Sequence, residues 1–144
     1  MNTGCSLCLA AELENLAVIR HFVQESAAAL GVDPAVISDV LLATDEAATN
    51  VIVHGYQGRS GTIELEVDRE AMDVVIRVRD NAPPFDPTRA LLPNLTRPLE
   101  ERPLGGLGIY LIRQSVDQVI YRITPQGGNE LILKKRITTG GGRQ

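Results

Sequence analysis

The chain has 144 residues, of which 44% are hydrophobic, and this is enough for one domain with a single core. A formal net charge of −4 argues against nucleic acid or an acidic membrane surface as the main partner. No apolar run approaches the roughly 18 residues of a membrane span. The N-terminal segment lacks the basic start of a secretory signal, so we expect a cytoplasmic protein with no direct membrane contact.

The first half of the chain predicts one strand followed by two helices. Residues 5–10 form a short apolar segment that is typical of a strand. Apolar residues then recur at helical spacing over residues 12–30. Asp33 and Pro34 are a suitable N-cap and first helical residue, so a second helix is expected from there to residue 54.

Two cysteines, Cys5 and Cys8, form a CxxC motif inside the first expected strand. A zinc site would need a second pair of ligands, and the chain contains no other cysteine. A thioredoxin-like redox site would need the motif at the start of a helix. We therefore interpret both residues as small apolar strand residues, with metal binding or redox activity as the weaker alternative.

The second half of the chain predicts four strands and one further helix. Residues 62–68 and 72–80 alternate apolar and polar side chains, which indicates an antiparallel hairpin. Residues 105–116 predict a helix with a glycine-rich start, and residues 119–124 and 130–137 predict the last two strands. Four charged residues of the hairpin could pair across the strands on an exposed face: Glu64, Glu66, Arg77 and Arg79.

The order of these elements favours an α+β fold. We expect one domain over residues 1–137, a two-layer α/β sandwich whose mixed, mostly antiparallel sheet carries helices on one face. Residues 138–144 are rich in glycine and are expected to form a flexible tail. Residues 81–103 lack periodicity and contain most of the prolines, and because such long loops are usually functional we expect a lid. Arg97 and Arg102 in this loop are candidate phosphate contacts, with solvated surface charge as the alternative.

Three polar residues recur every four positions on the otherwise apolar second helix, namely Glu46, Asn50 and His54. This spacing places them on one face of an α-helix. A solvated face is the simplest interpretation. The functional alternative is a site, because a carboxylate can orient or deprotonate a hydroxyl and an asparagine oxygen can bind Mg²⁺ that carries phosphates.

Two later features favour a site. Asp80 ends a strand beside the long loop, where its carboxylate can accept a hydrogen bond from the exocyclic amine of adenine. The alternative for Asp80 is a turn-initiating aspartate. Gly105, Gly106 and Gly108 open the last helix, where backbone amides and the helix dipole favour an anion. The glycine pattern is neither a Walker loop nor a dinucleotide-binding fingerprint.

Taken together, these segments resemble the anti-sigma regulatory factors. These are small serine protein kinases with the Bergerat ATP-binding fold, which is shared with histidine kinases, type II topoisomerases and Hsp90. The resemblance extends over residues 7–136. It rests on DEAATNVIVHGY at residues 45–56, VRDNAPPFDP at residues 78–87 and GGLGIYLIRQSVDQV at residues 105–119.

The resemblance also implies roles for individual residues. Glu46 falls on the general base of the family, Asn50 on its Mg²⁺ ligand and Asp80 on its adenine-recognising aspartate. Further nucleotide contacts are implied at Ala82, Gly105, Gly106, Leu107 and Gly108.

The implied function is that of an ATP- and Mg²⁺-dependent serine kinase. It would sequester a sigma factor, phosphorylate an anti-anti-sigma protein and form a homodimer. The alternative is a nucleotide-binding module that sequesters a partner without phosphorylating it. Ala82 in place of a usual glycine and a long loop without lysine keep this alternative open. The last strand also departs from the family, because Asn129 or Glu130 stands where better-known kinases carry threonine near the adenine.

Overall fold

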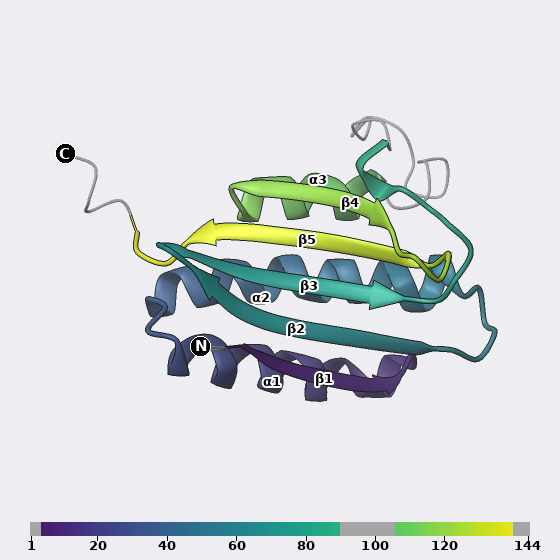
Figure 1. Cartoon of the computed structure of the whole chain (residues 1–144), viewed down its shortest axis with the longest axis horizontal. Coiled ribbons are helices and arrows are strands. Elements are labelled where there is room, and N and C mark those ends of the chain that lie inside the picture. Colours follow the sequence, from purple (N-terminus) through teal and green to yellow (C-terminus); the bar gives the residue numbers. More distant parts are fainter. Residues whose placement is uncertain (1–3, 90–105, 140–144) are drawn as a thin grey trace.

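A computed structural model describes residues 4–89 and 106–139 of the chain (Figure 1). Most of the expected lid, including Arg97 and Arg102, lies outside the described residues. The helices are α1 (Leu16–Ala29), α2 (Pro34–Thr49) and α3 (Gly106–Ser115). The strands are β1 (Cys5–Ala10), β2 (Thr62–Glu70), β3 (Asp73–Asp80), β4 (Gln118–Ile123) and β5 (Asn129–Arg136). Short 3₁₀ turns at Leu13–Asn15 and Pro87–Arg89 and a π-helical turn at Asn50–Gly55 are also present.

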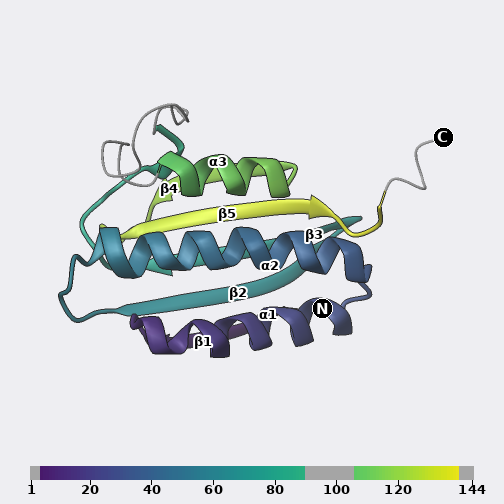
Figure 2. The same ribbon diagram turned by 180° about the vertical axis from the view of Figure 1, so that it is seen from behind.

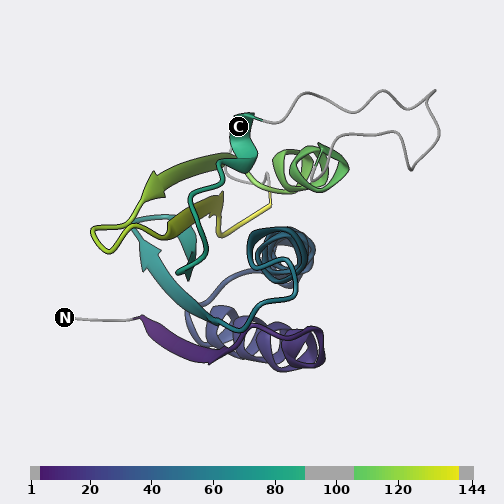
Figure 3. The ribbon, with the colours of Figure 1, turned by 90° about the vertical axis from the view of Figure 1, so that its right-hand side faces the viewer.

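The strands form one sheet in the order β1-β2-β3-β5-β4, and all three helices cover the same face of it (Figures 2 and 3). The expected α+β sandwich with helices on one face is therefore confirmed. The expectation of a mixed sheet is wrong, because every pair of neighbouring strands in the described part is antiparallel. The crossover through α3 does make β4 run in the direction of β3. The tight turn after β4 then returns β5 between them, so no two parallel strands are neighbours.

Most of the expected elements are confirmed, with small shifts at their ends. β2 continues to Glu70 because the turn into β3 is made at Ala71, whose φ is 56°. Asp33 stands at the N-cap position of α2, with Pro34 next to it. The Asp33 side chain makes no capping hydrogen bond and instead accepts one from the backbone N–H of Thr139, at 3.3 Å.

The core lies between the sheet and the helices. Alternate residues of the two central strands face the helices and are fully or almost fully buried, namely Ile63, Leu65, Val67, Val74, Ile76 and Val78. They belong to one cluster with Ile19 and Val23 of α1, Val36 and Val40 of α2, and Ile109 and Ile112 of α3. Because side chains alternate along a strand, Asp80 continues the inward-facing side of β3 and lies on the same face as the core.

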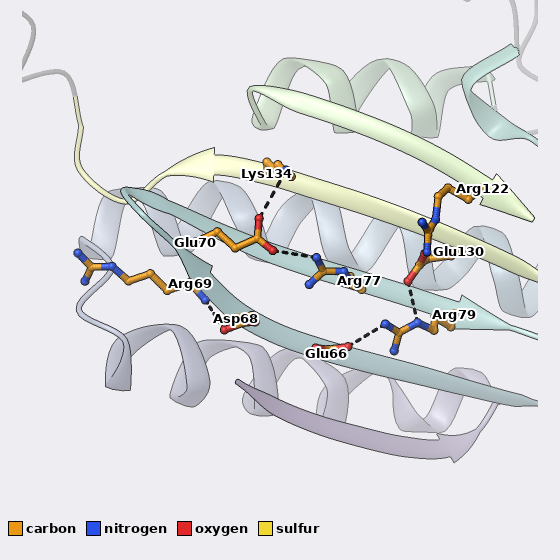
Figure 4. Close-up of polar contacts among 9 residues, drawn as sticks. All are labelled: Glu66, Asp68, Arg69, Glu70, Arg77, Arg79, Arg122, Glu130 and Lys134. Atoms are coloured by element: carbon orange, nitrogen blue, oxygen red, sulfur yellow. Dashed lines mark hydrogen bonds and ion pairs between the residues drawn. The ribbon is translucent and has the colours of Figure 1, made fainter. Parts of the chain in front are cut away.

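The opposite face of the sheet carries paired charges instead of helices (Figure 4). The Arg79 guanidinium lies 2.8 Å from Glu66, 3.6 Å from Glu64 and 2.7 Å from Glu130. The expected cross-strand pairing is therefore confirmed for Arg79, whereas Arg77 pairs with Glu70 at 2.9 Å. Since these charges compensate one another along and across the strands, this face does not need a helical cover.

The two cysteines of β1 are free thiols. They are three positions apart in a strand, so their side chains lie on opposite faces of the sheet. Cys5 and Cys8 of the same chain therefore cannot bind one metal ion together, and no group of three or more candidate metal ligands of the His, Cys, Asp and Glu types occurs among the described residues. Within residues 4–89 and 106–139, no helix has the length and apolar character needed to cross a membrane.

Candidate functional site

The helix that carries the polar residues changes its winding where the site begins. α2 ends at Thr49, and Asn50–Gly55 form a π-helical turn, which closes with a hydrogen bond from the Tyr56 N–H to the Val51 carbonyl at 3.0 Å. The expectation of an α-helix up to His54 is therefore wrong in its last turn. A π turn carries more residues than an α turn and is frequent at functional sites. The one-face spacing consequently holds for Glu46 and Asn50 but does not continue regularly to His54.

Glu46 and Asn50 meet the start of α3. A Cβ atom built on Gly108 would lie 3.3 Å from Oε1 of Glu46 and 3.4 Å from both Nδ2 and Oδ1 of Asn50. The structure thus brings together two polar side chains and one glycine that lie about sixty residues apart in the sequence. A residue with a side chain at position 108 would press against both polar groups, so glycine allows the start of α3 to lie this close to them.

Asn50 is buried, with 9% of its surface exposed, and its Nδ2 has no hydrogen-bond partner among the described residues. A buried donor without a partner is costly and calls for an explanation. The Asn50 side chain offers one hard oxygen and one unused N–H donor beside the glycine-rich end of α3. These are suitable groups for a polyphosphate and its cation.

Glu46 is half-buried beside Asn50. Burial, together with the negative charge of the neighbouring Asp45, raises the pKa of the Glu46 carboxyl above its ordinary value. Asp45 itself is held by Arg20 of α1 at 2.7 Å. A glutamate with a raised pKa accepts a proton more readily, which suits a general base.

Asp80 lies at the end of β3 with 6% of its surface exposed. Its Oδ1 accepts hydrogen bonds from the Ala82 N–H and from Nδ2 of Asn129, both at 2.8 Å. Burial raises the pKa of Asp80, and these two hydrogen bonds partly oppose the rise. The bond to the residue two positions ahead is the Asx-turn geometry. Asp80 therefore does initiate a turn, and it is also a buried carboxylate at a pocket.

The pocket lies between the end of α2 and the inner face of the sheet. It is mostly apolar, with a few polar groups that converge on it, which is the usual character of a small-molecule site. Its lining comprises Ala47, Asn50, Val51, Gly55, Val78, Asp80, Phe85, Pro87, Tyr121, Asn129 and Leu131. Asn50 thus belongs both to this pocket and to the contact with Gly108, so the two parts of the site are continuous.

Ala82 replaces the glycine that the family pattern would favour. It is buried and is not among the residues with positive φ, so an alanine fits its backbone conformation without strain. A Cβ atom on Gly55 would lie 3.4 Å from the Ala82 Cβ. The Ala82 methyl group therefore packs beside Gly55 of the π-helical turn.

The other expected phosphate contacts are only partly described. Gly105 lies outside the described residues, whereas Gly106 and Leu107 form the first turn of α3. The structure adds Asn129, Tyr121 and Phe85 to the pocket, and none of these was predicted as a site residue. A signal was present for Asn129, because Asn129 or Glu130 stands where related kinases carry threonine near the adenine, but the sequence does not decide which of the two faces the pocket.

The fold agrees with a comparison to known families. A family model described as the histidine kinase-like ATPase domain matches residues 9–135, which is most of the chain. The chain therefore belongs to the family of histidine kinase-like ATPase domains.

Several similar proteins indicate a more specific group within this family. The chain is 33% identical over 93 residues to the serine/threonine-protein kinase BtrW of Bordetella bronchiseptica, covering 64% of this chain and 65% of that protein. It is 33% identical over 104 residues to the anti-sigma F factor of Clostridium novyi, covering 70% of this chain and 71% of that protein. It is 30% identical over 131 residues to the serine-protein kinase RsbW of Bacillus thuringiensis, covering 88% of this chain and 81% of that protein. The resemblance to anti-sigma factors and serine protein kinases is thereby confirmed.

A solved structure supports the same fold. The crystal structure of the RsbU and RsbW domains of a Mycobacterium tuberculosis protein matches with a TM-score of 0.66 at 20% identity. The match covers 95% of this chain but only 33% of the mycobacterial chain. At this identity the likeness shows the fold alone.

Proposed function

We propose that the protein is an ATP-dependent protein serine kinase that also acts as an anti-sigma factor. It would sequester a sigma factor and phosphorylate a serine of an anti-anti-sigma protein, and it would do so in the cytoplasm, where sigma factors meet RNA polymerase. The observation that carries the proposal is the contact of Glu46 and Asn50 with Gly108, directly beside the pocket that contains Asp80.

The proposed binding mode follows from the chemistry of these groups. The base of ATP would lie in the apolar pocket, with its exocyclic amine donating to the Asp80 carboxylate. The phosphates would lie against the backbone of Gly106, Leu107 and Gly108 at the start of α3, with Gly105 just before it. Asn50 would bind Mg²⁺ through its Oδ1, while its Nδ2, which has no partner among the described residues, would donate to a phosphate oxygen. When bound, Mg²⁺ would neutralise charge on the phosphates.

Glu46 would act on the attacking serine. It lies one helical turn before Asn50, so it can approach the hydroxyl without serving as the metal ligand. Its raised pKa brings the carboxylate closer to the basicity that proton removal requires. Since phosphoryl transfer depends mainly on positioning and charge neutralisation, one such base with one metal ligand is a sufficient set of side chains for this chemistry.

Transfer of radiolabelled phosphate from ATP to a purified anti-anti-sigma protein tests this function. Glu46→Gln should lower the transfer rate by about 10²–10⁴-fold, the usual contribution of a general base, while ATP binding persists. Asn50→Ala should weaken binding of MgATP in calorimetry. Glu25→Gln, the same change at an exposed position of α1, is the matched control and should leave both quantities unchanged.

The same assay decides between the kinase and a module that only sequesters its partner. The alternative predicts that sigma factor is retained in a pulldown with ATP or ADP, but that no labelled acceptor forms. Wild-type transfer rates in Glu46→Gln would refute the role of Glu46. Absence of ATP binding in the wild-type protein would refute the proposed function as a whole.

A further inference from the structure

Asn129, the first residue of β5, makes more side-chain hydrogen bonds than the sequence suggested. It is 7% exposed and stands directly opposite Asp80 in the pairing of β5 with β3. Its Nδ2 donates to Oδ1 of Asp80 at 2.8 Å, and also reaches the carbonyls of Ala82 and Pro83, both at 3.2 Å. One amide group therefore connects the carboxylate at the strand end with the two residues that follow the turn.

The oxygen of the same amide is also occupied. Oδ1 of Asn129 accepts a hydrogen bond from the backbone N–H of Phe85 at 2.9 Å and another from the Tyr121 hydroxyl. These partners fix the orientation of the amide, because a flipped side chain would turn its NH₂ group toward the Phe85 N–H and its oxygen toward three acceptors. The side chain can therefore present only a donor to Asp80.

The backbone is also shaped for this contact. A Cβ atom on Gly128 would lie 2.0 Å from the carbonyl oxygen of Asp80, so only glycine allows β5 to begin this close to the end of β3. Asp80 and Asn129 consequently lie side by side on the inner face of the sheet, and both line the pocket.

We propose that Asn129 is a positioning residue that determines base specificity. By holding Oδ1 of Asp80, it leaves the other carboxylate oxygen, Oδ2, as the acceptor for an exocyclic amine of the bound base. Oδ2 accepts no hydrogen bond from the described residues. By holding the chain from Ala82 to Phe85, Asn129 also fixes one wall of the pocket. The proposal deepens the proposed function and rests on it, since it concerns the base of the same nucleotide.

This arrangement selects a purine with an amine at position 6 over one with a carbonyl there. A 6-oxopurine such as guanine would place an acceptor against the Asp80 carboxylate and leave both groups unpaired. Leaving buried polar groups unpaired is the strongest source of discrimination between ligands of similar shape. If Asn129 is shortened, the carboxylate and the chain at Ala82 are free to reorient, and the penalty against the wrong base falls.

Calorimetric titration with ADP and with GDP, each with Mg²⁺, tests the proposal. The wild-type protein should prefer ADP. Asn129→Ala should reduce the ratio of the two affinities by about 10- to 100-fold, since it removes the hydrogen bonds that hold Asp80 and the pocket wall. Asn129→Thr, which keeps one donor for Asp80 but cannot also reach both carbonyls, should give a smaller reduction. Asn81→Ala removes an exposed amide next to Asp80 and should leave the ratio unchanged.

The outcomes separate a specificity role from a structural one. A residue that only supported the fold would weaken ADP and GDP equally, so an unchanged ratio in both Asn129 variants overturns the proposal. Asn129→Thr retains a hydrogen-bonding group and provides the measurement if the alanine variant does not fold. Wild-type binding of ADP is tested first and by itself, because its absence would refute the nucleotide function, whereas unchanged ratios in the variants would refute only the role of Asn129.

Discussion

Replacing Gly108 by alanine should damage the chemistry of the site without destabilising the protein. Alanine has the higher helix propensity, and glycine in a helix interior costs up to about 1 kcal/mol relative to it. The backbone of α3 would therefore gain a small amount of stability. Against this gain stands the added methyl group, which would lie 3.3 Å from Oε1 of Glu46 and 3.4 Å from both polar atoms of Asn50.

These distances are tight rather than impossible. The carboxylate of Glu46 ends a flexible, half-buried side chain and can move by a few tenths of an ångström. Asn50 is buried and has less freedom. The free energy of unfolding should therefore stay within about 1 kcal/mol of the wild-type value. Displacement of the two side chains by a few tenths of an ångström should lower the phosphotransfer rate by roughly 3- to 10-fold, because a misplacement of about 1 Å can cost about 10²-fold.

Two measurements on the same sample are needed. Chemical denaturation gives the free energy of unfolding, and transfer of labelled phosphate gives the rate. Gln114→Ala raises helix propensity at an exposed position of the same helix and is the control, with wild-type activity expected. A Gly108→Ala variant with the wild-type transfer rate would show that the contact between α3 and the polar pair has no functional meaning. A variant with both low stability and low activity would also contradict the reasoning, since the rate would then report damage to the fold.

Three further predictions follow from the charges and from the family. The transfer rate should fall as the pH drops through the pKa of Glu46, which is raised by burial and, to a smaller extent, by the charge of Asp45. Asp45→Asn should move this fall in the pH–rate profile to lower pH. An unchanged pH–rate profile in Asp45→Asn would exclude an influence of Asp45 on Glu46. Glu130 is 3% exposed and binds Arg79 and Arg122, which are 30% and 63% exposed, so Glu130→Gln should cost about 1–2 kcal/mol in denaturation at neutral pH. Burial opposes ionisation of Glu130, but the two arginines outweigh it and lower its pKa, so this stabilisation is present above the ordinary pKa of a glutamate and should disappear as the pH falls through the lowered one. Light scattering at micromolar concentration should give the mass of a homodimer, and a monomer mass would reject that expectation.

Local patterns were sufficient for most of the elements. The alternation over β2 and β3 predicted both the hairpin and its inward-facing residues, because period-2 burial is a property of consecutive positions. The four-residue spacing placed Glu46 and Asn50 on one face of α2 for the same kind of reason. The π-helical turn from Asn50 onward could not be predicted, since the residues there also fit an α-helix.

Contacts between segments that are distant in the sequence could not be predicted from local patterns, because they depend on how the strands and helices pack. The sequence points to Asn129 or Glu130 without deciding between them, and only the return of β5 between β3 and β4 places Asn129 opposite Asp80. Gly108 likewise was predicted from the sequence only as part of an anion-binding helix start. Its contact with Glu46 and Asn50 exists because α3 packs beside α2 on the same face of the sheet (Figure 2).

The sequence by itself therefore determined the elements, the side of each strand that is buried and the types of polar group available for a nucleotide. It did so because backbone geometry and side-chain burial depend on neighbours within one or two turns of the chain. The tertiary structure alone decided the antiparallel strand order, the close approach of Gly108 to Glu46 and Asn50, and the orientation of Asp80 by Asn129. Each of these depends on which segments pack against one another, and that outcome is set by burial of the whole core between the sheet and the three helices.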